Sequence, residues 1–382
     1  MRICVIGAGI LGLTIAYELS LRGNDVVIIE KEAPFAGASH RSFAWINANS
    51  KQPAAYHRLN ALGVEEHIRF QEEFPSEVVW LSMTGNILAD FSDHSSDTYV
   101  HRIDRAKDYG YAVEELDRAE LVAREPSIAW PHDLDGAIFF PNEGYLDNDI
   151  LADELLAALS DQGVEIQHAC VESVESSTTH AKIKHDQGAE PFDQVVVAAG
   201  ARSRVLGENS GFQIPVADLS APSARTHSLL GLSEVTDVSL SHVVISDRIN
   251  VRPRHDGRMW VQVPFAEHRV EEGESPQLLQ EVRSVMETEL EQLFGTRIAV
   301  EDVIFSGRSF PEDGLSIMGY IDPEQRIYAA VTHSGMTLAP LFARLTAKEL
   351  EGERSPLLKD FRPSRFADGI KQVYEQGFIG KQ

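Results

Sequence analysis

The feature that most constrains this chain is a glycine pattern, G-x-G-x-x-G, which begins at the seventh residue. An apolar segment, Ile3 to Ile6, precedes the glycines, and a segment with helical character, Leu13 to Leu21, follows them. Gly23 and Asn24 end that helix, and a second apolar segment runs from Val26 to Ile29. This order predicts a strand, a glycine turn, a helix and a second, parallel strand, which is the beginning of a dinucleotide-binding fold.

Each glycine has its own role in such a turn. Gly7 permits the tight turn, Gly9 lets backbone N–H groups approach a pyrophosphate, and Gly12 lets the helix pack close to the strand. Glu30 ends the second strand, 18 residues after Gly12, where a ribose hydroxyl needs an acceptor. The contacts predicted from this segment are Gly7, Ala8, Gly9, Ile10, Leu11, Gly12, Glu30 and Lys31. NAD and FAD share the fingerprint, so the motif alone does not distinguish them.

Two later segments favour a flavin nucleotide. An apolar strand that ends in Ala-Ala-Gly, Val195 to Gly200, suits a second close backbone approach to the dinucleotide. Near the end of the chain, Ser334-Gly335 precede a helix that starts at about Met336 and has Pro340 in its predicted first turn. A helix N-terminus behind a glycine loop offers free N–H donors and a positive dipole end, which suits the N1–C2=O edge of a reduced flavin.

Composition and charge exclude several classes of partner. The 382 residues include 59 acidic and 34 basic side chains, a formal net charge of -25, which argues against nucleic acid or an anionic membrane surface. No apolar run of 18 residues or more occurs, so no transmembrane segment is expected, and no signal-peptide pattern is present. Cys4 and Cys170 are too few for a disulfide framework or a metal cluster, so no metal is expected. These observations predict a cytoplasmic protein, and they do not indicate its oligomeric state.

Six segments, in order, resemble the FAD-dependent D-amino-acid oxidase family, most closely its branch of glycine oxidase, sarcosine oxidase and D-amino-acid dehydrogenase. They are the opening fingerprint, GASHRSFAWINA, NEGYLD, VVVAAGARS, GRSFPEDGLSIMG and HSGMTLAPLFARLTAKEL. The resemblance runs from Arg2 to about Phe366. It implies a mixed α/β fold, with a Rossmann-like FAD-binding domain and a discontinuous, mostly antiparallel-sheet substrate domain. Because the chain leaves the nucleotide domain and returns to it, we expect 1–80, 140–210 and 301–382 to bind FAD, and 81–139 and 211–300 to form the substrate domain.

The resemblance also implies further contacts with FAD. The residues around Ser39 to Ser42 approach the pyrophosphate and the flavin. The backbone of Val171 meets the adenine, and Gly335 to Thr337 meet the pyrimidine edge of the flavin. With the two later segments described above, the added cofactor residues are Ser39, His40, Arg41, Ser42, Val171, Ala199, Gly200, Ser334, Gly335, Met336 and Thr337. Relatives with covalent flavin use a late cysteine, which this sequence lacks, or a histidine displaced by one residue from His40. Non-covalent FAD is therefore expected.

On the substrate side, the resemblance assigns the carboxylate of the substrate to Arg308, whose guanidinium fork matches two carboxylate oxygens. Alternatively, Arg308 pairs at the surface with Glu312 or Asp313. Arg248 and Asn250 have the spacing of one strand face, continued by Arg252, where relatives often have tyrosine or histidine. That face could equally be a solvent-facing strand edge.

Two more side chains are expected near the flavin. His333 directly precedes the Ser334-Gly335 loop, which places it beside the flavin and the substrate, unless local backbone hydrogen bonds hold its ring. Trp45 either walls the flavin site or fills the core. The predicted catalytic residues are Arg308, Arg248, Asn250 and His333.

The activity that the resemblance implies is oxidation of the CH–NH bond of a small amino acid: a D-amino acid, glycine or an N-methyl amino acid. Hydride transfer to flavin N5 would give an imine that water hydrolyses, and oxygen, a quinone or a protein would reoxidise the flavin. Three alternatives stay open. They are a flavin oxidase of hydroxy acids, an NAD(P)H-dependent flavin hydroxylase, and a flavoprotein subunit that is active only in a complex.

Overall fold

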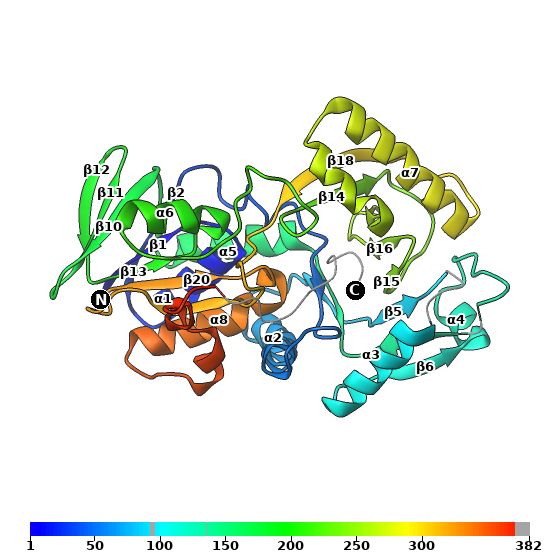
Figure 1. Cartoon of the computed structure of the whole chain (residues 1–382), viewed down its shortest axis with the longest axis horizontal. Helices are drawn as coiled ribbons and strands as arrows, with labels where there is room; N and C mark the ends of the chain where they lie inside the picture. Colours follow the sequence, from blue (N-terminus) through cyan, green and yellow to red (C-terminus); the bar gives the residue numbers. More distant parts are fainter. Residues whose placement is uncertain (92–95, 135, 371–382) are drawn as a thin grey trace.

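The computed structural model describes residues 1–91, 96–134 and 136–370. Residues 92–95, 135 and 371–382 also belong to the predicted domain segments, but they lie outside the described residues. Figure 1 shows two lobes side by side, each built around a large sheet. One lobe contains the strand of residues 2–6, the helix of residues 335–350 and the three-stranded sheet of residues 171–192 (Figure 1). The other lobe contains the long helix of residues 276–294.

The sheet of the first lobe has six strands in the order β19-β20-β13-β1-β2-β9. Five strands are parallel, and β19 joins the edge antiparallel to β20. The strands are β1 (Arg2–Ile6), β2 (Asp25–Glu30), β9 (Glu165–His168), β13 (Gln194–Val197), β19 (Ile317–Tyr320) and β20 (Ile327–Val331). Parallel strands that are covered on both faces need apolar side chains throughout, which explains the unbroken apolar runs of β1 and β13.

The two faces of this sheet are covered by different elements. Ile3 and Val5 pack into a core with four helices, whereas Cys4 and Ile6 pack on the opposite face with a small sheet and a short helix. The helices of the first face are α1 (Ile10–Leu21), α2 (Ala54–Glu73), α5 (Asn148–Asp161) and α8 (Gly335–Leu350). The second face carries β10 (Val171–Ser176), β11 (Ala181–His185), β12 (Gly188–Phe192), η1 (Gly200–Arg202) and α6 (Ser203–Ser210).

The second large sheet has eight strands in the order β18-β14-β17-β16-β15-β5-β7-β6. Its paired strands are antiparallel except for β15 and β5, which are parallel. The strands are β5 (Asn86–Ala89), β6 (Glu114–Asp117), β7 (Gly136–Phe140), β14 (His227–Ser233), β15 (Val243–Ser246), β16 (Asn250–Pro253), β17 (Met259–Gln262) and β18 (Val300–Gly307).

The remaining elements complete the two lobes. Helix α7 packs its apolar side chains, such as Val282 and Met286, against one face of the eight-stranded sheet. A further small sheet has the order β3-β8-β4. These elements are β3 (Trp45–Ile46), β4 (Leu81–Ser82), β8 (Gly144–Leu146), α3 (Ser96–Asp108), α4 (Arg118–Arg124), α7 (Pro276–Phe294), η2 (Pro264–Glu272), η3 (Pro356–Phe361) and η4 (Pro363–Phe366).

The mixed α/β fold class is confirmed. The sequence also predicts an amphipathic helix from about Pro276 to Phe294 and a hairpin turn at His255-Asp256-Gly257, and both are confirmed. The apolar spacing around Glu114 to Ala123 predicts a helix, and this prediction is wrong. Residues up to Asp117 form a strand, because the Asp117 carboxylate accepts from Glu120 N and starts a short helix there instead. Helix α1 also begins three residues earlier than expected, directly after Gly9.

The domain boundaries stay a prediction. The six-stranded sheet takes its strands from 2–30, 165–197 and 317–331, and the eight-stranded sheet takes its strands from 86–140 and 227–307. Strand β18, most of which lies in the segment assigned to the FAD-binding domain from 301 onward, pairs with β14 in the eight-stranded sheet.

No helix within the described residues has both the length and the apolar character that crossing a membrane requires. The exclusion of nucleic acid rests on net charge alone. Both it and the cytoplasmic location stay predictions.

Pro340 lies in the second turn of α8, deeper than expected, and leaves one carbonyl of the helix without its usual donor. A proline has no N–H, so the carbonyl of Met336, four residues earlier, loses its helical hydrogen bond. The Nε2 atom of His67, which lies on α2 and is fully buried, bonds that carbonyl instead. Helices α2 and α8 are therefore joined by a bond that needs a proton on Nε2.

We expect acid to destabilise the protein through His67. Burial lowers the pKa of His67 from 6.5 to about 4, because the charged ring would lose its hydration. The stabilisation by the neutral ring is therefore complete above pH 6.5 and is lost as the pH falls toward 4. The loss amounts to about 3 kcal/mol of unfolding free energy. Urea unfolding between pH 4.5 and 7.5 measures it.

His67→Gln should flatten this pH dependence, and His168→Gln, at an exposed position, should keep it. An unchanged pH dependence in His67→Gln would contradict the assignment.

Candidate functional site

Residues of both large sheets line one cavity of about 510 Å³. Gly7 leaves β1 with a φ of 104° and turns the chain into α1, whose first turn faces the cavity. A Cβ on Gly7 would lie 2.6 Å from the carbonyl oxygen of Ala198, at the end of the neighbouring strand β13. No side chain fits at this point, because the turn packs closely on β13, and the backbone of Gly7 lines the cavity.

Glu30 stands at the end of β2 and lines the same cavity. Its Oε2 accepts a hydrogen bond from Ala8 N at 2.7 Å, and its Oε1 accepts one from Glu32 N at 2.9 Å. These two bonds fix the carboxylate beside the glycine turn. A carboxylate at this place is an acceptor for hydroxyl groups of a ribose.

The loop between β2 and β3 closes over the glycine turn. Ser39 Oγ accepts from Ile10 N at 2.9 Å, so the loop is bonded to the first residue of α1. Asn148 Nδ2, at the start of α5, donates to the carbonyl of Ser39 at 2.7 Å. Ser306 Oγ, on β18, donates to the carbonyl of Arg41 at 2.9 Å. The loop is held from both lobes, and its residues Ser39, Arg41 and Ser42 line the cavity.

The other two glycine segments reach the cavity as well. Gly200 has a φ of 57°, and a Cβ there would lie 2.7 Å from Ser309 Oγ. Helix α8 starts at Gly335, and its N-cap residue Ser334 makes no side-chain capping bond. The N–H groups of its first turn therefore have no capping acceptor, and the positive end of the helix dipole faces the cavity.

Most of the predicted cofactor residues lie together. Those that line the cavity are Gly7, Gly9, Ile10, Leu11, Glu30, Lys31, Ser39, Arg41, Ser42, Val171, Ala199, Gly200, Ser334, Gly335, Met336 and Thr337. Ala8, Gly12 and His40 do not line it. Gly12 packs on the carbonyl of Gly7, Ala8 offers only its N–H to Glu30, and the side chain of His40 is exposed.

Arg308 lies at the end of β18 and lines the cavity. Its Nη1 donates to the carbonyl of Ala224 at 3.1 Å, and its Nη2 lies 3.4 Å from Oε2 of Glu267, a fully buried carboxylate. Burial raises the pKa of Glu267 to about 7, although the Arg308 charge opposes the shift. The surface alternative is not observed, because Asp313 pairs with Arg365.

His333 also lines the cavity, and burial, together with the charges of Lys51 and Arg308, holds its pKa well below the usual 6.5. Tyr56 OH donates to Ser334 Oγ at 2.8 Å, so the Tyr56 oxygen is left to accept from His333 Nε2 at 3.5 Å. That arrangement leaves Nδ1 unprotonated, and Nδ1 has no partner among the described residues. His333 is therefore a neutral ring with one acceptor atom to spare.

Arg248 is a wrong prediction for this cavity. Strand β16 begins only at Asn250, and the chain bends at Asp247 and Arg248, so the two-residue alternation does not extend that far back. The side chain turns toward α7, where Nη2 pairs with Glu289 at 2.9 Å. Asn250 does line the cavity and is buried, which excludes the solvent-facing alternative.

Arg252, next on the same face of β16, supports the cavity wall without lining it. Its side chain is 0% exposed, its Nε bonds the carbonyl of Phe43, and its Nη1 lies 3.6 Å from Asp147. Trp45, which lines the cavity, is close in sequence to the bonded carbonyl. A buried guanidinium thus ties the predicted flavin loop to the second sheet.

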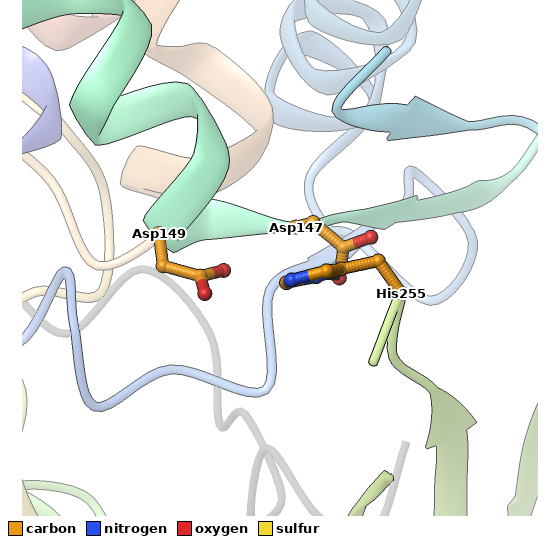
Figure 2. A group of neighbouring side chains, drawn as sticks. All are labelled: Asp147, Asp149 and His255. Carbon is orange, nitrogen blue, oxygen red and sulfur yellow. Dashed lines mark ion pairs between the residues drawn. The ribbon is translucent and has the colours of Figure 1, made fainter. Parts of the chain in front are cut away.

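Asp147 belongs to a charged cluster between the lobes. Figure 2 shows Asp147 and Asp149, at the start of α5, directed toward His255 in the β16–β17 turn; their ligand atoms lie within 4.8 Å of one another. Arg252 and Arg254 pair with the two carboxylates. These guanidinium groups already balance the acidic charge, so the cluster acts as an ion-pair link between the lobes.

Sequence reasoning missed three residues of this region. Gln262 faces the cavity because the turn at residues 255–257 sets a register that pairs it with Asn250, and that signal could have been used. Lys51 and Glu267 carry no local motif. They reach the site only because the loop before α2 and the η2 segment fold against it.

The comparisons with known proteins agree with this arrangement. The model of the FAD dependent oxidoreductase family DAO matches residues 2–349. The chain belongs to this family. It is therefore an FAD-dependent oxidoreductase, as the resemblance implied. The residues present fit that cofactor, since the backbones of Gly7, Gly9 and Gly200 line the cavity, and the first turn of α8, which has no side-chain cap, lines it as well.

Individual relatives have low sequence identity to this chain, but the similarity extends over most of its length. The glycine oxidase of Geobacillus kaustophilus is 24% identical over 365 residues, 91% of this chain and 92% of that protein. The bifunctional protein ThiO/ThiG of Synechocystis sp. is 24% identical over 379 residues, 95% of this chain but 54% of that protein, so the chain spans about half of it. The crystal structure of glycine oxidase from Geobacillus kaustophilus superposes with a TM-score of 0.81 at 20% identity, over 95% of this chain and 99% of that chain. At this identity the likeness shows the fold.

We expect Glu30→Ala to weaken FAD binding. A hydrogen bond to a charged group contributes about 1.5–3 kcal/mol, so the Kd for FAD should rise by roughly tenfold to a hundredfold. Titration of the apoprotein with FAD, followed by flavin fluorescence, measures this Kd. Asp25→Ala, at the other end of β2, should leave it unchanged. Equal affinities of Glu30→Ala and the wild type would show that Glu30 does not hold the ribose.

Proposed function

We propose that the protein oxidises the CH–NH bond of a small amino acid, which is a D-amino acid, glycine or an N-methyl amino acid. The observation that carries this proposal is the position of Arg308. Its guanidinium lines the same cavity as the glycine turn and the α8 N-terminus, from the opposite lobe. A carboxylate-binding group then stands across from the predicted flavin site.

Arg308 would bind the carboxylate of the substrate. Its bonds to Glu267 and to the carbonyl of Ala224 fix the orientation of the guanidinium. Asn250 and Gln262, on neighbouring strands, offer amide groups to the same space. A substrate that is held at its carboxylate and at its polar groups presents its α-carbon in a fixed direction.

His333 would receive the amine. Its ring is neutral, and its Nδ1, which has no partner among the described residues, is a hydrogen-bond acceptor that suits an N–H group of the substrate. An amine must be uncharged to give up a hydride from the adjacent carbon. A neutral acceptor in a positively charged environment favours that form over the ammonium ion.

FAD, when bound, accepts the hydride and so supplies the redox chemistry of the reaction. Ser334 to Thr337 would meet its pyrimidine edge, the Ser39–Ser42 loop its pyrophosphate, and Glu30 its ribose. The chain's own groups orient the substrate and exclude water. The imine product would then hydrolyse to a carbonyl compound and ammonia or an amine.

Anaerobic bleaching of the flavin absorbance tests this function. The panel consists of D-amino acids, glycine, N-methyl amino acids, hydroxy acids and NADPH. Bleaching by amino acids, with release of a carbonyl product, is the expected result. Bleaching by hydroxy acids alone or by NADPH would overturn the proposal, and so would a flavin that no amino acid reduces.

Arg308→Ala should raise the half-saturating concentration of any amino-acid substrate and lower kcat/KM by about a hundredfold. Truncating one partner of a buried charge pair costs about 2–5 kcal/mol. Steady-state kinetics measures the change. Because this change also strips Glu267 of its partner, the double variant Arg308→Met/Glu267→Gln separates misfolding from lost binding. It should fold and hold FAD, yet show the same loss, and Arg204→Ala on the surface should show none. Unchanged substrate saturation in Arg308→Ala would contradict the assignment.

A further inference from the structure

Lys51 is a buried cation that forms no ion pair with any of the described residues. Its side chain is 4% exposed and lines the cavity, at the end of the loop that leads from β3 to α2. Across the described residues, its ammonium group makes no hydrogen bond and no ion pair within 4 Å. Burial lowers the pKa of Lys51 to about 8, so the group is mostly charged at neutral pH.

The charge of Glu143 acts on Lys51, but the two groups form no ion pair within 4 Å. Glu143 is fully buried, and its carboxylate accepts from Ala48 N at 2.9 Å, Asn49 N at 2.8 Å, Asn49 Nδ2 at 2.7 Å and Tyr111 OH at 3.1 Å. Three of these four donors belong to the loop before Lys51, and the fourth is Tyr111. Glu143 therefore holds the loop in place, and the side chain of Lys51 lines the cavity.

Arg308 is a second cation in the same space, and it comes from a different element. Arg308 follows β18 of the eight-stranded sheet, whereas Lys51 lies beside α2, which packs on α8. Both charges, together with that of Arg225, lower the pKa of His333, which precedes α8 and lines the same cavity. Two cations from different elements therefore line one cavity with His333.

A ligand with a single carboxylate would neutralise only one of them. Glu267 partly balances Arg308, at 3.4 Å, and no acid pairs with Lys51 among the described residues. Burying a charge without a partner is costly, because the group loses its hydration and gains nothing in exchange. A second anionic group on the ligand removes that cost.

We propose that Lys51 is a second anion-binding residue, and that the preferred substrate is an amino acid with two carboxylates, one at Arg308 and one at Lys51. This inference rests on the proposed function, of which it specifies the substrate class. The carboxylates would be those of an acidic D-amino acid or of an N-carboxymethyl amino acid. Lys51 would determine specificity, and it takes no part in the transfer of the hydride.

Matched substrate pairs test the proposal by anaerobic flavin reduction. The pairs are D-alanine with D-aspartate, and glycine with iminodiacetate; in each, the second compound adds one carboxylate. We expect the holoenzyme to reduce its flavin at least about tenfold more efficiently with the dicarboxylate of one pair. Lys51→Met should lower kcat/KM for that compound by roughly thirtyfold or more, and much less for its partner. Lys51→Arg should restore part of the preference, and Lys182→Met, an exposed lysine on β11, should change neither value.

A binding measurement gives a second readout that needs no turnover. Malonate and acetate, titrated into the oxidised holoenzyme, perturb the flavin absorbance and yield two Kd values. The wild type should bind malonate more tightly, and Lys51→Met should lose at least about tenfold more affinity for malonate than for acetate.

Two failures can be told apart. If the two compounds of each pair reduce the flavin equally efficiently, Lys51 does not bind a second carboxylate. The same conclusion follows if Lys51→Met lowers kcat/KM equally for both compounds. Oxidation of amino acids by the protein would stand in either case. A flavin that no amino acid bleaches overturns the proposed function. In that case, malonate binding that is insensitive to Lys51→Met overturns the anion site as well, and sensitive binding supports it.

Discussion

The close contact between β1 and α1 is the constraint on which the rest of the structure depends. A Cβ at Gly12 would lie 1.9 Å from the carbonyl oxygen of Gly7, so the helix approaches the strand as nearly as a backbone can. This contact brings the first turn of α1 to the end of the sheet, where Ile10 N bonds the Ser39 loop. The same turn presents bare backbone to the cavity. The cofactor end of the site is thus a consequence of packing, achieved with almost no specialised side chains.

The substrate end is built differently, from buried carboxylates that hold the walls. Glu143 gathers two backbone N–H groups and fixes the loop that ends at Lys51. Glu267 bonds Leu229 N at 3.2 Å and stands beside Arg308. In both cases a buried carboxylate accepts hydrogen bonds from a neighbouring segment. These bonds make the cavity wall rigid and fix the position of a nearby cationic side chain. Arg252 does the same with opposite charge when it bonds the carbonyl of Phe43.

The prediction from sequence succeeded where one local pattern determines one local conformation. The three glycine segments, the long helix Pro276–Phe294 and the turn at residues 255–257 each satisfy that condition, and the structure has all of them. It failed at Arg248, because a two-residue alternation says nothing about where the strand begins. It also failed at Glu114–Ala123, where a capping aspartate divided one apolar pattern into a strand and a helix. Pro340 shows a third case, since the sequence marks the missing donor but not His67, the residue that replaces it.

By itself, the sequence determined the family and the cofactor, and it indicated Arg308, which lines the cavity. These properties depend on glycine backbones and on segments whose residues are adjacent along the chain. Only the tertiary structure decided which charges face the cavity. Lys51 and Glu267 lie more than two hundred residues apart, and no local preference places either one. Their positions follow from how the second lobe folds onto the first, because burial and charge are set by neighbours in space.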